Sequence, residues 1–529
     1  MGREKSDDRV VPQAPRKFGV TARSERGGKA VTASEFVDQL NLFGETAENP
    51  KGGHGKSGRQ AKVKGGPATS RLHVVPQSRT KVRQDLPAMS MEEVTSWDNM
   101  MSAFKQVASN KGAPGPDRQS IGDVRKNLVH VLRALQRSLL NGTYMPGAVR
   151  RVWIPKGGGG RRGLGIPNVV DRIAQQAVYQ VLSPHYEQSF HPSSHGFRPK
   201  RSCHTAIAEA RTHIEAGYTW VVDFDLEKFF DRVNHQRLLA RLGQRVFDPR
   251  LLQSIHRMLK AAVVMPDGVV VRTEEGTPQG GPLSPLLSNI VLDELDWELE
   301  RRGHHFVRYA DDSNIYVRSE RSGQRVMASV TQFIERRLRL KVNESKSAVG
   351  RPADRHFLGF RIMYSVEGNR SSVRLSERSV LRLWAKVKEL TPRNWGQSLD
   401  ACITRLNRSL EGWLQFYHPM SPKQIRLLRY TDAHIRRRLR AIQLRHWRRR
   451  RTIARRLIQL GVRRNTAWRL VYAQRRKWWV LSGHAVVGRV LNVAHFEGRG
   501  LMSLEHRWRE LYSQHLQRMA PAQLELALG

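Results

Sequence analysis

The sequence has few cysteines and no long apolar run. Its 529 residues include only Cys203 and Cys402, and neither has a second Cys or a His at the spacing of a metal site. Neither a disulfide framework nor a zinc site is supported, and a reducing cytoplasm fits. No apolar stretch of about 18 residues occurs, and the N-terminal MGREKSDDRV lacks the apolar core of a signal peptide. We expect a soluble, cytoplasmic protein with no membrane partner.

Acidic residues are also scarce. The chain has 91 Lys and Arg against 47 Asp and Glu, a formal net charge of +44. Such an excess of positive charge is typical of proteins that bind a polyanion. Ribosomal and chromatin proteins can be equally basic, but 12 Trp and a hydrophobic fraction of 39% in so long a chain indicate several packed domains. Nucleic acid is the expected partner.

The composition changes along the chain. Residues 1–90 are polar, rich in Gly, Ser, Lys and Arg and without helical or strand periodicity, which predicts a mostly disordered basic leader. Apolar residues at helical spacing begin near Met91 and end at GAPGPD. From there to about residue 365 short strands mix with amphipathic helices, so an α+β fold is expected. After about residue 370 helical patterns dominate and predict a second, helical domain.

Three predicted elements converge on acidic residues. The run TWVVDFDL (219–226) reads as a buried strand, and HFVRYADDSNIYVRS (305–319) reads as a hairpin with Ala310, Asp311 and Asp312 at its turn. Between them, GPLSPLLSNIVLDELDWELERRG predicts a helix opened by Pro and Ser and ended by Gly303. Its apolar stripe contains Leu286, Ile290 and Leu299. We expect strand, helix and hairpin to meet at the carboxylates.

This arrangement of carboxylates suits magnesium. Joining a nucleotide to a primer requires an activated 3′-hydroxyl and a neutralised triphosphate, and two divalent ions about 4 Å apart do both. Magnesium prefers hard oxygen ligands. Asp225, Asp311 and Asp312 are the candidates in this chain. An isolated Asp-Asp pair is usually a surface feature, so the surrounding sequence decides between the two interpretations.

Eight segments around these residues resemble, in order, the conserved blocks of reverse transcriptases. Residues 91–515 resemble the proteins encoded by bacterial group II introns, most closely their class C, whose members lack an endonuclease domain. In the basic tail the resemblance is weaker and rests on GWLQFY (412–417) and the Arg-rich helices. The eight segments are NKGAPGPD, RRVWIPKGGGGRRGLGIPNVVDRIAQQAV, HGFRPKRSCHTAI, VVDFDLEKFFDRVNH, TEEGTPQGGPLSPLLSNIVLDELD, VRYADDSNIYV, LKVNESKS and FLGF.

The resemblance implies a right-hand polymerase fold. Fingers and palm would span 91–365, a helical thumb or maturase domain 366–440 and a basic helical DNA-binding region 441–529. The protein would be an RNA-directed DNA polymerase and a maturase that assists splicing of a group II intron and copies intron RNA into DNA during retromobility. Its cofactors would be two Mg²⁺ ions, and its partners intron RNA, target DNA with a primer, and deoxynucleoside triphosphates. It would be nucleoid-associated in the bacterial cytoplasm when bound to DNA.

The resemblance also implies the metal ligands. Asp225 with the Leu226 carbonyl matches the first palm block, and Asp311 and Asp312 complete the set. Asp223, two residues earlier on the same strand face, is the rival of Asp225. Asp225 is favoured because Phe230, five residues later, matches the bulky residue that blocks a ribose 2′-hydroxyl; an ordinary core Phe is the alternative.

Further residues match binding positions of the family. Lys156 and Arg162 resemble finger residues that clasp the incoming triphosphate. The alternative is a solvated basic hairpin, which would have the same sequence pattern. Gln279 resembles a residue of the nucleotide pocket, and Lys346 is placed near phosphate at the primer end. The turn of Phe357, Leu358 and Gly359 resembles the one that grips the primer, and simple packing is the alternative.

The C-terminal part has a stretch with no acidic residue, from Ala433 to Phe496. Solvated helix faces usually alternate in sign. Arginines interleaved with tryptophans favour phosphate contact and base stacking instead. The arginines expected to contact nucleic acid are Arg436, Arg437, Arg438, Arg448, Arg449, Arg450 and Arg451.

Two other functions fit parts of this pattern. The first is a non-catalytic RNA-folding cofactor that has lost the chemistry, which the retained Asp225, Asp311 and Asp312 disfavour. The second is a related reverse transcriptase recruited for phage defence, which the long Arg-rich helical tail disfavours.

Overall fold

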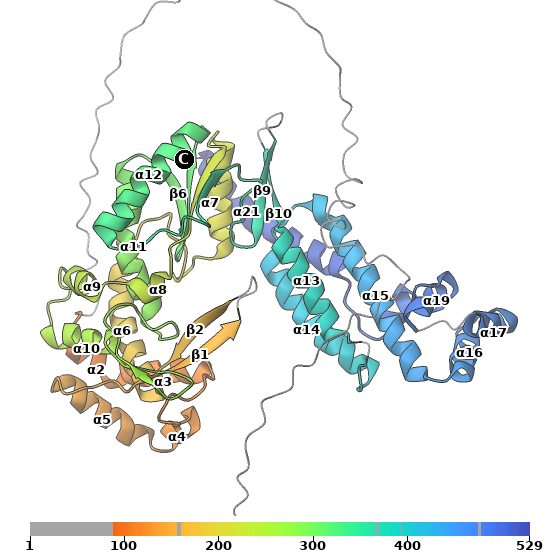
Figure 1. Ribbon diagram of the computed structural model, residues 1–529, viewed down its shortest axis with the longest axis horizontal. Coiled ribbons are helices and arrows are strands. Elements are labelled where there is room, and N and C mark those ends of the chain that lie inside the picture. Colours follow the sequence, from red (N-terminus) through yellow and green to blue (C-terminus); the bar gives the residue numbers. More distant parts are fainter. Residues whose placement is uncertain are drawn as a thin grey trace, which may run out of the picture. The chain divides into compact units, whose positions relative to one another are not determined.

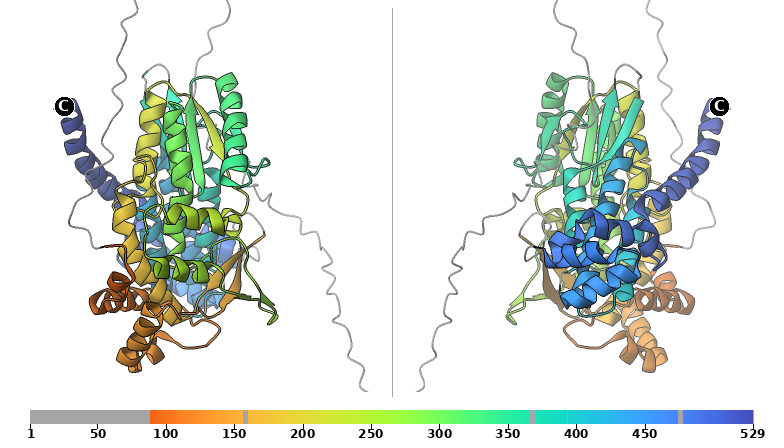
Figure 2. Two further views of the ribbon diagram at one scale, coloured as in Figure 1. Left: turned by 90° about the vertical axis from the view of Figure 1, so that its left-hand side faces the viewer. Right: turned by 90° about the vertical axis from the view of Figure 1, so that its right-hand side faces the viewer.

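The computed structural model describes residues 88–155, 160–365, 368, 370–392, 394–473 and 478–528. The predicted leader lies outside these residues except for its last three, and Lys156 lies outside them as well. The described part mixes α-helices with small β-sheets, as the α+β prediction requires (Figures 1 and 2). None of its helices is long and apolar enough to cross a membrane.

Five helices and the segments between them open the described chain. The predicted helix from Met91 breaks at Ser96, whose extended backbone ends one helix and whose side chain accepts a hydrogen bond from the Asn99 amide of the next. The fifth helix, α6, is buried on almost every side, so it forms the centre of the core around which the others pack. The five are α2 (Met91–Thr95), α3 (Trp97–Ser109), α4 (Ile121–Lys126), α5 (Leu128–Leu140) and α6 (Val169–Glu187).

One sheet carries the predicted carboxylates. Its strand order is β6-β7-β3-β8, with every neighbouring pair antiparallel. Tyr309 pairs with Asp312 and closes the hairpin, while Phe224 pairs with Ser313 beside it. This register brings the end of β3 to the hairpin turn, which confirms the predicted strand and hairpin. The strands are β3 (Trp220–Phe224), β6 (His305–Tyr309), β7 (Asp312–Val317) and β8 (Ala348–Gly350).

Helices beside this sheet contribute buried apolar side chains to the hydrophobic core. The predicted helix is α11, and its stripe of Leu286, Ile290 and Leu299 is buried as expected. Its last residue lies two positions before Gly303, which has a φ of 73°. The helices beside the sheet in Figure 1 are α7 (Cys203–Glu215), α11 (Ser284–Arg301) and α12 (Glu320–Phe333), which continues as η1 (Ile334–Leu338).

A second sheet has the order β2-β1-β4-β5. Its hairpin is tied to the Pro278-Gln279-Gly280 turn, because the Gly165 amide donates to the Gln279 carbonyl at 2.7 Å. A Cβ at Gly280 would lie 2.4 Å from the Gly165 oxygen, so only glycine permits this approach. The strands are β1 (Val149–Pro155), β2 (Arg161–Ile166), β4 (Val263–Val264) and β5 (Val270–Val271), and nearby helices are α8 (Phe229–Arg232), α9 (His235–Leu242) and α10 (Pro249–Leu259).

The C-terminal part is helical after one more hairpin. That hairpin, β9 (Phe360–Ser365) with β10 (Arg370–Leu375), extends a few residues past the predicted last strand. The predicted domain boundary at 440/441 falls inside α15, where Ala441, Ile442 and Leu444 are buried, so the chain has no structural break there. The helices are α13 (Glu377–Leu390), α14 (Leu399–Tyr417), η2 (Pro422–Gln424), α15 (Ile425–Trp447), α16 (Arg450–Gln459), α17 (Arg464–Tyr472), α18 (Trp478–Ser482), α19 (Ala485–Val490), α20 (Val493–Glu497) and α21 (Leu504–Leu528).

Candidate active site

The hairpin turn between β6 and β7 presents Asp311 and Asp312. Ala310 and Asp311 are its two central residues, and Ala310 has a φ of 58°. A positive φ at the first central residue is the pattern of a type II′ turn, where glycine is preferred. An Ala in this conformation costs about 1–2 kcal/mol. The turn therefore holds backbone strain at the position of the paired carboxylates.

Asp225 follows β3 and is fixed from the opposite side by the segment 343–347. The Asp225 backbone N–H donates to the Ser347 hydroxyl at 3.0 Å and not to a neighbouring strand. The Asp225 carbonyl accepts a hydrogen bond from the Asn343 amide at 2.8 Å. The Lys346 ammonium lies 3.3 and 3.4 Å from the two Asp225 carboxylate oxygens. Lys346 thus contacts a predicted metal ligand, a pairing that the sequence did not reveal.

Asp223 has a different environment. Its side chain accepts two hydrogen bonds from Arg355, at 2.6 and 3.1 Å, and it lies within β3 opposite Asn314. Asp225 lines the large cavity described below, whereas Asp223 does not. Both carboxylates thus have a basic partner, Lys346 or Arg355, and it is the position in the cavity wall that favours Asp225 as the residue available to an external cation.

The carboxylates around the turn repel one another. Burial by the surrounding protein, and then the charges of Asp311, Asp223 and Asp225, raise the pKa of Asp312 to about 7, although water still reaches its side chain. Burial also raises the pKa of Asp311 above its ordinary value. Within the described residues, no three Asp, Glu, His or Cys side chains lie close enough together to form a preformed metal-binding site. The carboxylates around the turn are nevertheless hard oxygen donors whose negative charges lie close together. A divalent cation would neutralise this charge, so the donor set fits such an ion.

A cavity of about 1000 Å³ gathers most of the predicted nucleotide-binding residues. Arg162 on β2 donates to the Gln279 side chain at 2.7 Å and so links the β1–β2 hairpin to the Pro-Gln-Gly turn. Phe230 is only 7% exposed but contributes to the wall. The predicted residues that line this cavity are Arg162, Asp225, Leu226, Phe230, Gln279, Asp311 and Lys346.

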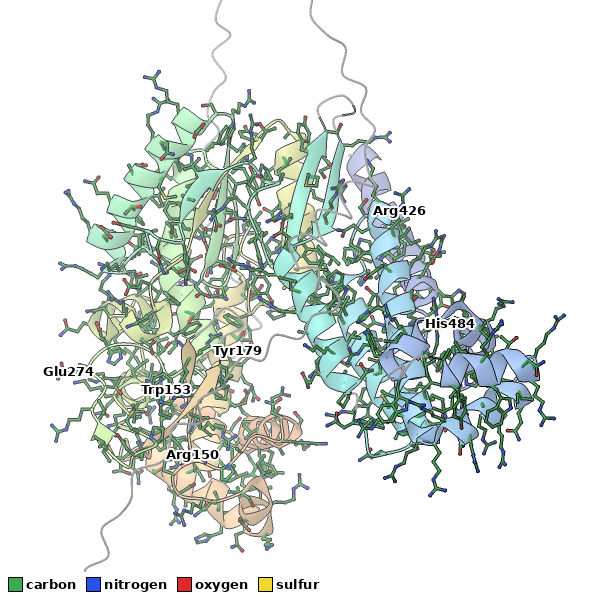
Figure 3. All side chains as sticks on the ribbon, turned by 45° about the vertical axis from the view of Figure 1, so that its right-hand side comes forward. Arg150, Trp153, Tyr179, Glu274, Arg426 and His484 are labelled. Carbon is green, nitrogen blue, oxygen red and sulfur yellow. The ribbon has the colours of Figure 1, made fainter. Side chains whose placement is uncertain are left out.

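Trp153 on β1 also lines the cavity, and sequence reasoning missed it. It is 42% exposed, and the Arg151 guanidinium lies over its ring at 5.7 Å. Figure 3 labels Trp153 and the neighbouring Arg150 on this hairpin. The available signal was an aromatic residue between the arginines and Lys156, a combination that favours base stacking in nucleic-acid-binding proteins.

The turn of Phe357, Leu358 and Gly359 is not part of this cavity's lining. Leu358 and Gly359 have φ values of 51° and 90°, and the Phe357 and Phe360 backbones exchange two hydrogen bonds, the pattern of a type I′ turn. The Gly359 carbonyl accepts from Ser379 at 2.8 Å, and the Tyr417 hydroxyl donates to Ser379 at 3.1 Å. The turn packs on α13 and α14, and its contact with a primer stays a prediction.

The predicted phosphate-binding arginines differ in exposure. The four from Arg448 to Arg451 are exposed, at the junction of α15 and α16, and none makes an ion pair with a described residue. Arg437 is exposed and lies 4.4 Å over the Trp479 ring. Side chains of this region project from the blue helices around the labelled His484 in Figure 3.

Arg438 corrects one of these predictions. Its side chain is 8% exposed, and its guanidinium donates to the Thr391 hydroxyl and carbonyl and to the Lys388 carbonyl. These acceptors lie at the C-terminal end of α13, where the last carbonyls lack helical partners. Arg438 therefore caps α13 inside the protein rather than facing a nucleic acid.

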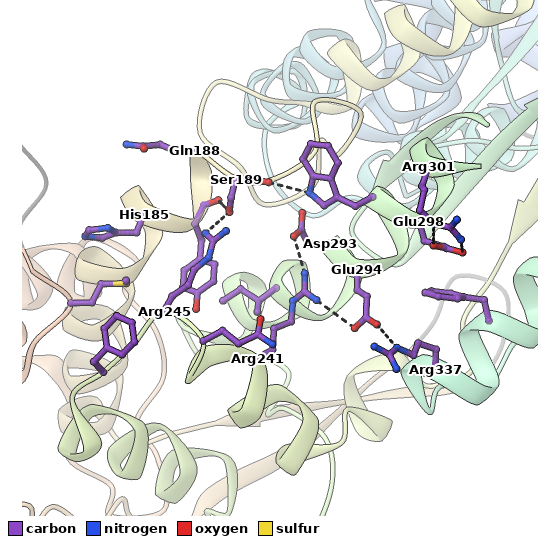
Figure 4. A pocket seen from close by; sticks show the side chains of 17 residues that line it. His185, Gln188, Ser189, Arg241, Arg245, Asp293, Glu294, Glu298, Arg301 and Arg337 are labelled. Atoms are coloured by element: carbon purple, nitrogen blue, oxygen red, sulfur yellow. Dashed lines mark hydrogen bonds and ion pairs between the residues drawn. The ribbon is translucent and has the colours of Figure 1, made fainter. Parts of the chain in front are cut away.

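A second cavity of about 1000 Å³ lies among α6, α9, α11 and η1 (Figure 4). Its charges are largely paired: Arg241 bonds to Asp293 at 2.9 Å and Arg337 to Glu294 at 2.9 Å. Arg245 donates to the Ser189 hydroxyl at 2.7 Å. None of the predicted site residues lines this cavity.

Comparisons with known proteins agree with this geometry. The family model "Reverse transcriptase (RNA-dependent DNA polymerase)" matches residues 154–362, and "Group II intron, maturase-specific domain" matches residues 380–458. Protein YkfC of Escherichia coli is 31% identical over 359 residues, which are 60% of this chain and 92% of that protein. Group II intron-encoded protein LtrA of Lactococcus lactis is 38% identical over 198 residues, 37% of this chain and 32% of LtrA.

The Putative COX1/OXI3 intron 2 protein of Saccharomyces cerevisiae is 32% identical over 205 residues, 38% of this chain and 24% of that protein. The chain thus spans nearly all of YkfC and about a third or less of the two intron proteins. The maturase match begins within α13 and ends within α16, so it crosses the predicted boundary at 440/441. The chain belongs to the family of group II intron-encoded reverse transcriptases that carry a splicing maturase domain.

Proposed function

We propose that this reverse transcriptase synthesises DNA in the cavity between β2 and the carboxylate turn, with the RNA of a group II intron as its template. The observation that carries this proposal is the convergence in one cavity of Asp225, Asp311, Arg162, Phe230 and Gln279, which come from segments far apart in the sequence. Substrates are a primer and deoxynucleoside triphosphates.

Asp225, Asp311 and Asp312, with the Leu226 carbonyl, are proposed to hold two Mg²⁺ ions. Bound ions would supply the positive charge that activates the primer 3′-hydroxyl and neutralises the triphosphate. The protein contributes the placement of its carboxylates on a fixed turn and on the end of β3. Lys346, now paired with Asp225, would contact a phosphate at the primer end once bound ions neutralise the carboxylates.

The cavity walls orient the nucleotide. Arg162, together with Lys156, clasps the triphosphate, because a guanidinium presents a planar fork to phosphate oxygens. The hydrogen bond from Arg162 to Gln279 closes the pocket around the base and sugar. Phe230 occupies the space that a ribose 2′-hydroxyl would need, so the site prefers deoxynucleotides. Trp153 stacks on a base near the entrance.

The fold then divides into working parts. Residues 91–365 form the fingers and palm, α13 and α14 the thumb, and the arginine-rich helices from α15 onward the nucleic-acid-binding region. The turn of Phe357 to Gly359 would grip the primer where it leaves the palm. Exposed arginines at the α15–α16 junction contact intron RNA or target DNA, and the protein works in the bacterial cytoplasm, on the nucleoid when DNA is bound.

Primer extension on an RNA template tests the assignment of the carboxylates. Asp311→Ala should abolish extension with Mg²⁺ but leave RNA affinity nearly unchanged, because it removes a metal ligand and no basic surface. The control is Asp267→Ala, which removes the same group from the exposed turn between β4 and β5 and should extend normally. Full extension by Asp311→Ala would refute the assignment.

A further inference from the structure

Arg308, two residues before Ala310, is a completely enclosed arginine. It is 1% exposed, and its partner Asp296 on α11 is 0% exposed. All five guanidinium N–H groups have an acceptor. Nε and Nη2 bond to the two Asp296 oxygens at 2.7 and 2.5 Å, Nη2 also bonds to Ser194 at 2.7 Å, and Nη1 bonds to Asn289 at 3.0 Å and to the Ala310 carbonyl at 2.9 Å.

These bonds connect the carboxylate turn to two other segments. Asn289 and Asp296 belong to α11, and Ser194 belongs to the loop before α7. The Asn289 side chain also donates to the Gly196 carbonyl at 2.9 Å. Gly196 lies so close to the turn that a Cβ there would be 2.2 Å from the Ala310 nitrogen. The turn is therefore held by a buried polar network on one side and by close backbone packing on the other.

Stability alone does not explain this network. Replacing a buried ion pair with apolar residues of similar volume is often neutral or stabilising. What an apolar residue cannot do is donate a hydrogen bond to the Ala310 carbonyl. Ala310 is the residue with the positive φ, and such backbone conformations persist only where the surroundings fix them.

We propose that Arg308, held in place by Asp296, is a positioning residue for the reaction. Its bond to the Ala310 carbonyl fixes the orientation of the peptide that precedes Asp311, and thereby the directions of the Asp311 and Asp312 carboxylates. The inference rests on the proposed function of these carboxylates and adds the element that sets their geometry.

The test is the double variant Arg308→Met with Asp296→Leu, which removes the charges together and leaves no unpaired buried ion. We expect kcat for primer extension to fall about 10- to 100-fold, the scale of a displacement of about 1 Å at a reacting group. The KM for deoxynucleotide and the affinity for intron RNA should stay close to wild type, because the cavity walls are retained. The melting temperature should fall, because Asn289, Ser194 and the Ala310 carbonyl lose their donor, so kcat is measured well below it.

The matched control is Arg241→Met with Asp293→Leu. It also removes an Arg–Asp pair anchored on α11, bonded at 2.9 Å, but neither residue bonds to the turn. This control should keep its kcat. An equal loss of kcat in both double variants would mean that any disturbance of α11 has the same effect, and the proposal would fail.

A folded double variant of Arg308 and Asp296 with wild-type kcat would show that the pair is only structural. If that variant does not fold, Arg308→Lys decides. The lysine keeps the positive charge beside Asp296 but has three donors in place of five. We therefore expect kcat to fall with little change in melting temperature. A wild-type kcat in this variant would overturn the inference. Wild-type protein that extends no primer would instead refute the proposed function.

Discussion

The arginine run from Arg448 to Arg451 allows a quantitative test of nucleic-acid binding. All four side chains are exposed, and none makes an ion pair with a described residue, so each is available to a phosphate. Each phosphate contact contributes about 0.7 (single strands) to 0.9 (duplex DNA) to the slope of log affinity against log salt, so four contacts contribute about 2.8 to 3.6. Changing all four to Ala should make the slope shallower by that amount.

The predicted change in slope determines how the difference in affinity between the wild type and the four-alanine variant depends on salt concentration. Between 50 and 200 mM salt, the affinity advantage of the wild type should shrink by roughly 50- to 150-fold. Affinity for the intron RNA would be measured by filter binding at several salt concentrations, with extension of a saturating, pre-annealed primer-template as the activity control. Extension should stay comparatively intact, since the carboxylates lie elsewhere in the chain.

Arg438 is the matched control for this measurement. It belongs to the same basic stretch, but its guanidinium is buried against Thr391 and the Lys388 carbonyl. Arg438→Ala should therefore leave the salt slope unchanged and lower the free energy of unfolding by about 2–4 kcal/mol, because buried acceptors lose their donors. An unchanged slope and affinity in the variant of Arg448 to Arg451 would show that this run is a solvated helix face.

Two further outcomes are expected. Phe230→Ala should raise the incorporation of ribonucleotides relative to deoxynucleotides in single-nucleotide extension. Unchanged discrimination would mean that another residue excludes the ribose 2′-hydroxyl, and it would weaken the preference for Asp225 over Asp223. Burial and then the charge of Asp296 raise the pKa of Asp293 from 3.8 to about 6, so the folded state binds this proton more tightly than the unfolded chain. The stability gained from this proton is full below pH 3.8 and is lost as pH rises through 6. Asp293→Asn should gain stability relative to wild type across this range, by about 1–3 kcal/mol, and a constant difference in melting temperature would contradict it.

The sequence predicted the elements whose patterns are local. The continuous apolar strand before Asp225, the alternating hairpin around Ala310 and the Pro-opened helix with Leu286 and Ile290 all appear in the structure, because each is set by residues next to one another. Strand ends shifted by a few residues, and the helix from Met91 split at Ser96, since a single N-capping serine decides such a break.

Contacts between distant residues could not be predicted in the same way. Arg438 lies in a run of similar arginines, and only the position of Thr391 on another element shows that it points inward. The pairing of Lys346 with Asp225 and of Arg355 with Asp223 likewise depends on how β8 and the segments before and after it meet β3. The placement of Arg308 beside Asp296 needs the packing of α11 against the sheet, which the residue pattern of neither segment encodes.

The continuity of α15 determines how the protein can be divided into fragments. The helix has 23 residues and extends about 35 Å without a break. Cutting at 440/441 would expose Ile442 and Leu444 and split one hydrogen-bonded cylinder, so neither half should be soluble and ordered alone. Proteases should likewise spare this helix and cleave within residues 394–398, which are mostly exposed, between α13 and α14. A fragment meant to carry the arginine-rich helices should therefore begin at or before Ser398 and keep α14 and α15 intact.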